Sequence, residues 1–175
     1  MTYKLKILTL LISCNIFFFF LITILATNIS NYCCFVEWSF SALYESDKES
    51  ILFDTGFHED TVLHNAKILG KDLSKVNKVV LSHFHSDHTG GLIKLRQTYK
   101  NINKKAFSEV YVARGFFDQR FYKDGSKEGP GNFKDSSKFK QKAEEEGIRF
   151  IILDDDKMIF IQIQMIIYIE IKHAE

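Results

Sequence analysis

One short run constrains this chain more than any other, because three imidazoles and a carboxylate fall within residues 83–88 as His83, His85, Asp87 and His88. His83 and His85 flank one residue, so in extended chain both side chains leave the same face and can hold one ion. Asp87 and His88 follow a turn and can reach a second ion. Imidazole with carboxylate suits zinc, and also iron or manganese, better than calcium or magnesium. The run therefore predicts a metal site.

The flanking sequence places this run in a loop. Residues 76–81 are apolar and β-branched, which is typical of a buried strand, and Gly90 and Gly91 precede an apolar pattern typical of a helix. Open α/β sheets place their sites at the carboxyl ends of strands. An ion held there with an open position lowers the pKa of bound water to about 7. Hydrolysis is therefore the expected class of reaction.

The rest of the chain alternates strand and helix patterns. Strands are expected at residues 40–44, 50–53, 109–112 and 148–153, and helices at residues 61–69, 92–99 and 137–146. A long loop with Gly, Ser, Lys and the one proline occupies residues 123–137. This alternation predicts a layered α/β domain.

Two motifs together resemble the metallo-β-lactamase superfamily: the H-x-H-x-D-H run and residues 51–56, which end in Asp-Thr-Gly. The likeness extends from about residue 37 to about residue 159. Residues 37–43, 63–66 and 72–76 further resemble a branch of dihydropterin-methyl-ribofuranosylaminobenzene phosphate synthase-like proteins. The resemblance implies an αββα sandwich and a dinuclear centre, usually of zinc, with iron or manganese as alternatives.

The resemblance also implies roles by position. His83 and His85 would bind the first ion, Asp87 and His88 the second, and Asp87 would be the catalytic residue. Asp54 would support the ligands from behind, although a turn-capping Asp before Thr55-Gly56 is an equal alternative. In the resembling branch the region around Arg120 borders the substrate pocket, so Arg120 could bind an anionic group; a surface Arg beside packing aromatics is the alternative.

The family pattern requires further ligands that this chain does not show. Besides the run it holds only His58, His64 and His173. His64 falls in an expected helix and is interpreted as a surface or packing residue, and His173 lies three residues from the end. We therefore interpret the chain as a C-terminally truncated member, with the N-terminal half largely present and feeble catalysis or none.

The amino-terminal region permits two interpretations. Residues 7–26 carry no charge and follow Lys4 and Lys6, which predicts a signal anchor and a membrane-associated protein. Alternatively, residues 22–28 form the first strand of the family fold in a cytoplasmic chain. The adjacent Cys33 and Cys34 are expected to be free thiols, because three cysteines do not make a disulfide framework.

These observations give three expected segments: a signal-like segment at 1–26, a partial metallo-β-lactamase-like domain at 27–160 and a diverged strand-like tail at 161–175. A net charge of +1 gives no indication of nucleic-acid binding. The expected function is a metal-dependent hydrolase acting on a small molecule, for which an anionic or phosphorylated compound is one candidate. The alternatives are a synthase acting on a phosphoribosyl substrate and a non-catalytic, membrane-tethered remnant.

Overall fold

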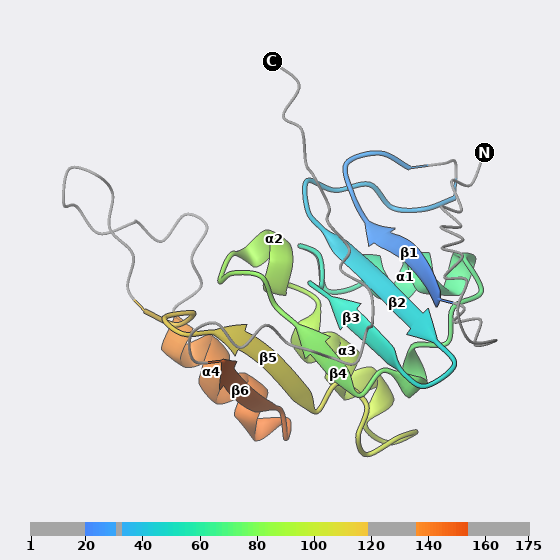
Figure 1. Cartoon of the computed structure of the whole chain (residues 1–175). Coiled ribbons are helices and arrows are strands. Elements are labelled where there is room, and N and C mark those ends of the chain that lie inside the picture. The colour runs from blue at the N-terminus through green and yellow to red at the C-terminus, as the bar shows by residue number, and fades with distance from the viewer. Residues whose placement is uncertain (1–19, 31–32, 119–135, 154–175) are drawn as a thin grey trace, which may run out of the picture.

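The computed structural model describes residues 20–30, 33–118 and 136–153 (Figure 1). Its elements, in chain order, are β1 (Phe20–Ala26), β2 (Ser41–Ser46), β3 (Ser50–Phe53), α1 (Thr61–Ile68), the 3₁₀ turn η1 (Leu73–Lys75), β4 (Lys78–Val80), α2 (Ser86–Thr89), α3 (Leu92–Tyr99), β5 (Glu109–Ala113), α4 (Ser136–Glu145) and β6 (Arg149–Leu153).

The six strands form one mixed sheet in the order β1-β2-β3-β4-β5-β6. The first three strands pair antiparallel, and β3 to β6 pair in parallel. Figure 1 shows α1, α3 and α4 on one side of this sheet. The prediction of an α/β fold is confirmed. The parallel half brings the loops that follow β3, β4 and β5 to one edge of the sheet, where the His-rich run lies.

A row of fully buried side chains crosses the sheet beneath the helices. Leu43 pairs with Leu52, Leu52 with Val79, and Val79 with Val110, and each of the four is 0% exposed. The next residue along β3, Phe53, lies on the opposite face and is 40% exposed. This difference follows from the two-residue period of a strand, and it shows that the helix side carries the hydrophobic core.

The prediction of a membrane-spanning segment at residues 7–26, and with it a membrane-associated localisation, is wrong. Residues 20–26 form strand β1, whose Thr23 pairs with Leu43 of β2, and Leu25 and Ala26 are 1% exposed in the core. The alternative of a first strand near residues 22–28 describes this region better. Within the described ranges, no helix has the length and apolar character needed to cross a bilayer. Residues 1–19 lie outside them.

The other predicted elements agree with the structure to within two residues at either end. The helix expected at 92–99 and the strand expected at 50–53 are reproduced as α3 and β3. The strand expected at 76–81 is shorter in the structure. β4 covers only Lys78–Val80, and Val76 and Leu81 lie just outside it. The expected loop at 123–137, except for its last two residues, and the tail at 161–175 lie outside the described residues.

Candidate metal centre

Phe84 fixes the direction of the two histidines beside it. Its ring is 5% exposed and packs against Phe116 and Phe139, with ring centroids 5.6 and 5.3 Å away. The chain turns at Phe84, where the His85 N–H donates to the His83 carbonyl oxygen at 3.0 Å. His83 and His85 are only partly buried, on either side of the buried ring. Their ring centroids lie 4.3 Å apart. The structure thus places the two side chains together, as the spacing predicts.

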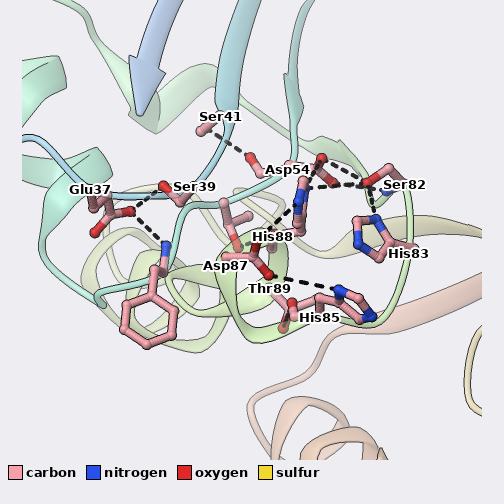
Figure 2. Close-up of polar contacts among 12 residues, drawn as sticks. Glu37, Ser39, Ser41, Asp54, Ser82, His83, His85, Asp87, His88 and Thr89 are labelled. Carbon is pink, nitrogen blue, oxygen red and sulfur yellow. Dashed lines mark hydrogen bonds and ion pairs between the residues drawn. The ribbon is translucent and has the colours of Figure 1, made fainter. Parts of the chain in front are cut away.

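The one-turn helix α2 brings the second pair of residues to the same place. His88 lies with its ring centroid 4.2 Å from that of His83. Asp87 lies between two imidazoles, with Oδ2 3.4 Å from Nε2 of His88 and Oδ1 4.0 Å from Nδ1 of His85. Thr89 closes the turn by donating its hydroxyl to the His85 carbonyl oxygen at 2.9 Å. Figure 2 shows these side chains gathered on one side of the loop.

Asp54 supports this cluster from beneath. It follows β3, is 1% exposed and has a φ of 51°, in the left-handed region that residues with a Cβ rarely adopt. Its carboxylate accepts hydrogen bonds from the backbone N–H and the hydroxyl of Ser82, both at 2.8 Å. Nδ1 of His88 lies 2.7 Å from Oδ2 of Asp54. This strained backbone and these three contacts fix the His88 ring.

The local charges shift two imidazoles in opposite directions. Burial alone would lower the pKa of His88, but the hydrogen bond from its ring to Asp54 and the charges of Asp54 and Asp87 raise it above its usual value. The pKa of His83 is lowered, because burial disfavours its charged form and His88 and His85 add repulsion. At neutral pH the site therefore favours a neutral His83 beside a more basic His88.

Backbone contacts hold the turn after β3 against the His-rich loop. Thr55 donates its N–H to the His88 carbonyl oxygen at 2.7 Å, and Gly90 donates to Gly56 at 2.9 Å. A Cβ on Gly90 would lie 1.8 Å from the Phe57 carbonyl oxygen, which no side chain could tolerate. The Gly90-Gly91 pair is therefore required by this close backbone approach as well as by the start of α3.

The donor set fits a transition metal in kind, since it combines imidazole nitrogens with a carboxylate. Among the residues that the structure describes, however, no group of three or more His, Cys, Asp or Glu side chains is arranged to hold a single ion. What the loop supplies is two adjacent pairs, His83 with His85 and Asp87 with His88. These pairs are the residues through which an ion would be held.

The remaining predicted residues fall outside this cluster. His64 stacks on Phe35 with ring centroids 3.8 Å apart, and its Nε2 lies 3.0 Å from the Cys33 carbonyl oxygen, so it is a packing residue. The thiols of Cys33 and Cys34 are free. Arg120 and His173 lie outside the described residues.

Sequence reasoning missed two residues that contact the same loops, Glu37 and Ser82. Glu37 accepts four hydrogen bonds around the turn that follows β3. Its only sequence signal is its position in the segment that carries the family likeness. Ser82, the first residue after Leu81, is also a contributor, and its position immediately before the first histidine of the run is the signal that could have found it.

The fold and the loop define a class of protein: a mixed α/β domain with a His- and Asp-bearing loop at the carboxyl edge of its parallel strands. The family model of the metallo-β-lactamase superfamily matches residues 39–157. The chain belongs to this superfamily, as the resemblance of its two motifs predicts.

Individual relatives match parts of the chain. A 7,8-dihydropterin-6-methyl-4-(β-D-ribofuranosyl)-aminobenzene-5'-phosphate synthase from Methanocaldococcus jannaschii is 41% identical over 58 residues, which is 33% of this chain and 19% of the synthase. A crystal structure of a metal-dependent hydrolase of the β-lactamase superfamily has 26% identity and a TM-score of 0.50, over 77% of this chain and 42% of that one. Human tRNase Z, short form, has 17% identity and a TM-score of 0.47, over 75% and 42%. The chain thus spans less than half the length of each.

Proposed function

We propose that this chain binds divalent metal through His83, His85, Asp87 and His88 and acts as a metal-dependent hydrolase on a small molecule. Membership of the superfamily and the likeness to a metal-dependent hydrolase support the class of reaction. Zinc is the proposed ion, with iron or manganese as alternatives of similar ligand preference. When bound with an open position, such an ion supplies a water whose pKa is lowered to about 7.

The observation that carries the proposal is the placement of the His88 ring between two carboxylates. An ionised carboxylate only accepts hydrogen bonds, so Nδ1 must carry the proton that is shared with Asp54 at 2.7 Å. In the neutral ring Nε2 then carries a lone pair and can only accept, and it faces an oxygen of Asp87 at 3.4 Å. Two acceptors held this close require a cation or a second proton between them.

The other residues have roles that follow from their positions. His83 and His85 present adjacent imidazoles, and the lowered pKa of His83 keeps that ring in the neutral form that metals require. We propose that Asp87 would contribute negative charge toward the cation and act as the catalytic residue. Asp54 orients His88 without touching substrate, as carboxylates behind metal-bound histidines do.

A second candidate function is a synthase acting on a phosphorylated substrate. The 41% identity to the archaeal synthase favours it, although only 58 residues carry that identity. Such a substrate would present a phosphate to the protein, and Arg120 is the proposed partner because a guanidinium grips phosphate through paired hydrogen bonds. The metal ligands would be the same in both functions.

The test is hydrolysis of esters, lactones and phosphodiesters, compared with turnover of a phosphoribosyl substrate, by the full chain in the presence of Zn²⁺, Mn²⁺ or Fe²⁺ and after EDTA treatment. We expect metal-dependent turnover that disappears in a His83→Ala/His85→Ala double variant. His58→Ala is the matched control, since it removes an exposed imidazole outside the cluster. Turnover that is unaffected by EDTA, or by the double variant, would refute the proposal. Preference for the phosphoribosyl substrate would favour the synthase.

A further inference from the structure

Glu37 is unusually well bound for a residue that lies between the exposed Val36 and Trp38. One carboxylate oxygen accepts hydrogen bonds from the Phe57 N–H at 2.6 Å and the Ser39 hydroxyl at 2.5 Å. The other accepts from the His58 N–H at 3.1 Å and from a threonine hydroxyl, that of Thr61, at 2.7 Å. These four donors occupy the usual acceptor positions of a carboxylate. Glu37 is therefore committed to the protein and has no capacity left for an ion.

The carboxylate lies directly against the turn that follows β3, which we call the 54–58 turn after its residues. A Cβ on Gly56 would lie 2.7 Å from Oε1 of Glu37, and Gly56 has a φ of +74°. Both facts require glycine at this position. The backbone of the turn is thus shaped to receive the carboxylate.

The opposite side of the 54–58 turn contacts the His-rich loop. The His88 carbonyl oxygen accepts both the N–H and the hydroxyl of Thr55, at 2.7 and 3.0 Å. Gly56 accepts from Gly90 at 2.9 Å. The turn also begins with Asp54, whose carboxylate lies 2.7 Å from the His88 ring. Glu37 and His88 therefore hold opposite sides of the same five residues.

The segment that bears Glu37 also reaches the loop directly. Phe40 donates its N–H to the Asp87 carbonyl oxygen at 3.3 Å and accepts from Gly56 at 3.0 Å. Figure 2 shows Glu37 and Ser39 on the side of the turn away from His83. Any shift of the turn is thus transmitted to both Asp87 and His88.

We propose that Glu37 is a positioning residue for the metal centre: it fixes the 54–58 turn so that Asp54 holds the His88 ring by Nδ1 and leaves Nε2 directed toward Asp87. The inference about the ion rests on the proposed function, whereas the inference about the His88 ring does not. Loss of the Glu37 carboxylate removes four hydrogen bonds from the turn, and two of their donors are backbone N–H groups that have no other role in the helix or the sheet.

The experiment compares the full-length chain with Glu37→Ala and Glu37→Gln. Glutamine keeps one accepting oxygen, so it can serve one of the two backbone N–H groups and should rescue partly. Glu49→Gln is the matched control, because it removes a carboxylate, just before β3, that contacts Lys78 at the start of β4. The first readout is ¹⁵N NMR of the His88 ring in metal-free protein, which reports which nitrogen carries the proton. The second is the dissociation constant for Co²⁺.

We expect Glu37→Ala to lower the fraction of the Nδ1-protonated His88 ring and to weaken Co²⁺ binding about tenfold or more, as loss of supporting groups does. Glu37→Gln should be intermediate and Glu49→Gln unchanged. Wild-type ring protonation and Co²⁺ affinity in both Glu37 variants would overturn the proposal; if Glu37→Ala does not fold, the Glu37→Gln result decides alone. Absence of Co²⁺ binding in the wild type would refute the proposed function, and the NMR readout would still test the role of Glu37.

Discussion

Replacement of Asp54 by Asn probes the support of the cluster while leaving its shape almost unchanged. The backbone N–H of Ser82 lies 2.8 Å from Oδ1 and can only donate. The amide oxygen of Asn must therefore remain at that position, since the amide nitrogen there would face another donor. The amide nitrogen is then directed at Nδ1 of His88, which lies 2.7 Å from the other oxygen in the wild type.

The consequence is a change in which nitrogen of the His88 ring carries the proton. Facing a donor, Nδ1 must accept, so the ring proton moves to Nε2. That nitrogen faces Asp87 Oδ2 at 3.4 Å and becomes a donor to it. A protonated Nε2 has no lone pair for a metal ion, so the variant should lose one of the two ligands that Asp87 and His88 offer together.

The size of both effects follows from the contacts that change. Loss of a group supporting a metal ligand weakens metal binding about 10- to 100-fold, which is about 1.4–2.7 kcal/mol. Three hydrogen bonds to a buried carboxylate become bonds to a neutral amide, with an expected loss of about 2 kcal/mol in the free energy of unfolding. For a chain of this size, that lowers Tm by about 4–8 °C.

Three measurements test this account: isothermal titration with Zn²⁺, ¹⁵N NMR of the His88 ring and thermal unfolding of metal-free protein. Glu109→Gln is the matched control, because it removes a carboxylate that pairs with Arg149 at 2.8 Å on a different pair of strands. The reasoning is refuted if Asp54→Asn keeps wild-type Zn²⁺ affinity and an Nδ1-protonated His88, or if Glu109→Gln shows the same losses.

The remaining predictions concern protons and packing. Because the pKa of His88 is raised, protons should compete with metal from a higher pH than for free imidazole, so affinity should fall as the pH drops through that pKa; Zn²⁺ titrations between pH 6 and pH 8.5 check this. Gly90→Ala should destabilise by about 3 kcal/mol in urea, because its Cβ meets a carbonyl oxygen, whereas Gly70→Ala, with no atom within 4 Å, should cost only about 1 kcal/mol of left-handed strain. Leu52→Ala should cost about 2–5 kcal/mol and Phe53→Ala about 1 kcal/mol or less, since the two side chains lie on opposite faces of β3; equal losses would contradict the assigned faces.

Local patterns were sufficient for the elements whose burial repeats regularly. The apolar spacing of residues 92–99 and 50–53 is sufficient to predict a helix and a strand, because it indicates which face is buried. The first strand is ambiguous from sequence, because an uncharged run satisfies both a membrane span and a buried strand. Pairing with β2 decided between them, and that partner lies in another part of the sequence.

The site shows the same division between local and distant information. The spacing of His83 and His85 places their rings together, because only one intervening residue and the inward Phe84 are involved. The contact from Asp54 to His88 joins positions 34 residues apart, and the contacts of Glu37 span 20 to 24 residues around the 54–58 turn. Such contacts depend on the sheet, which no local pattern specifies.

The central claim is that the loop after β4 binds metal through imidazoles. X-ray absorption spectroscopy of the full chain loaded with one equivalent of Zn²⁺ tests it most directly, because imidazole rings give a distinctive outer-shell scattering pattern. We predict imidazole and oxygen ligands in the wild type and loss of the imidazole pattern in the His83→Ala/His85→Ala variant. A zinc environment of sulfur from Cys33 and Cys34, or one that the double variant leaves unchanged, would contradict the claim.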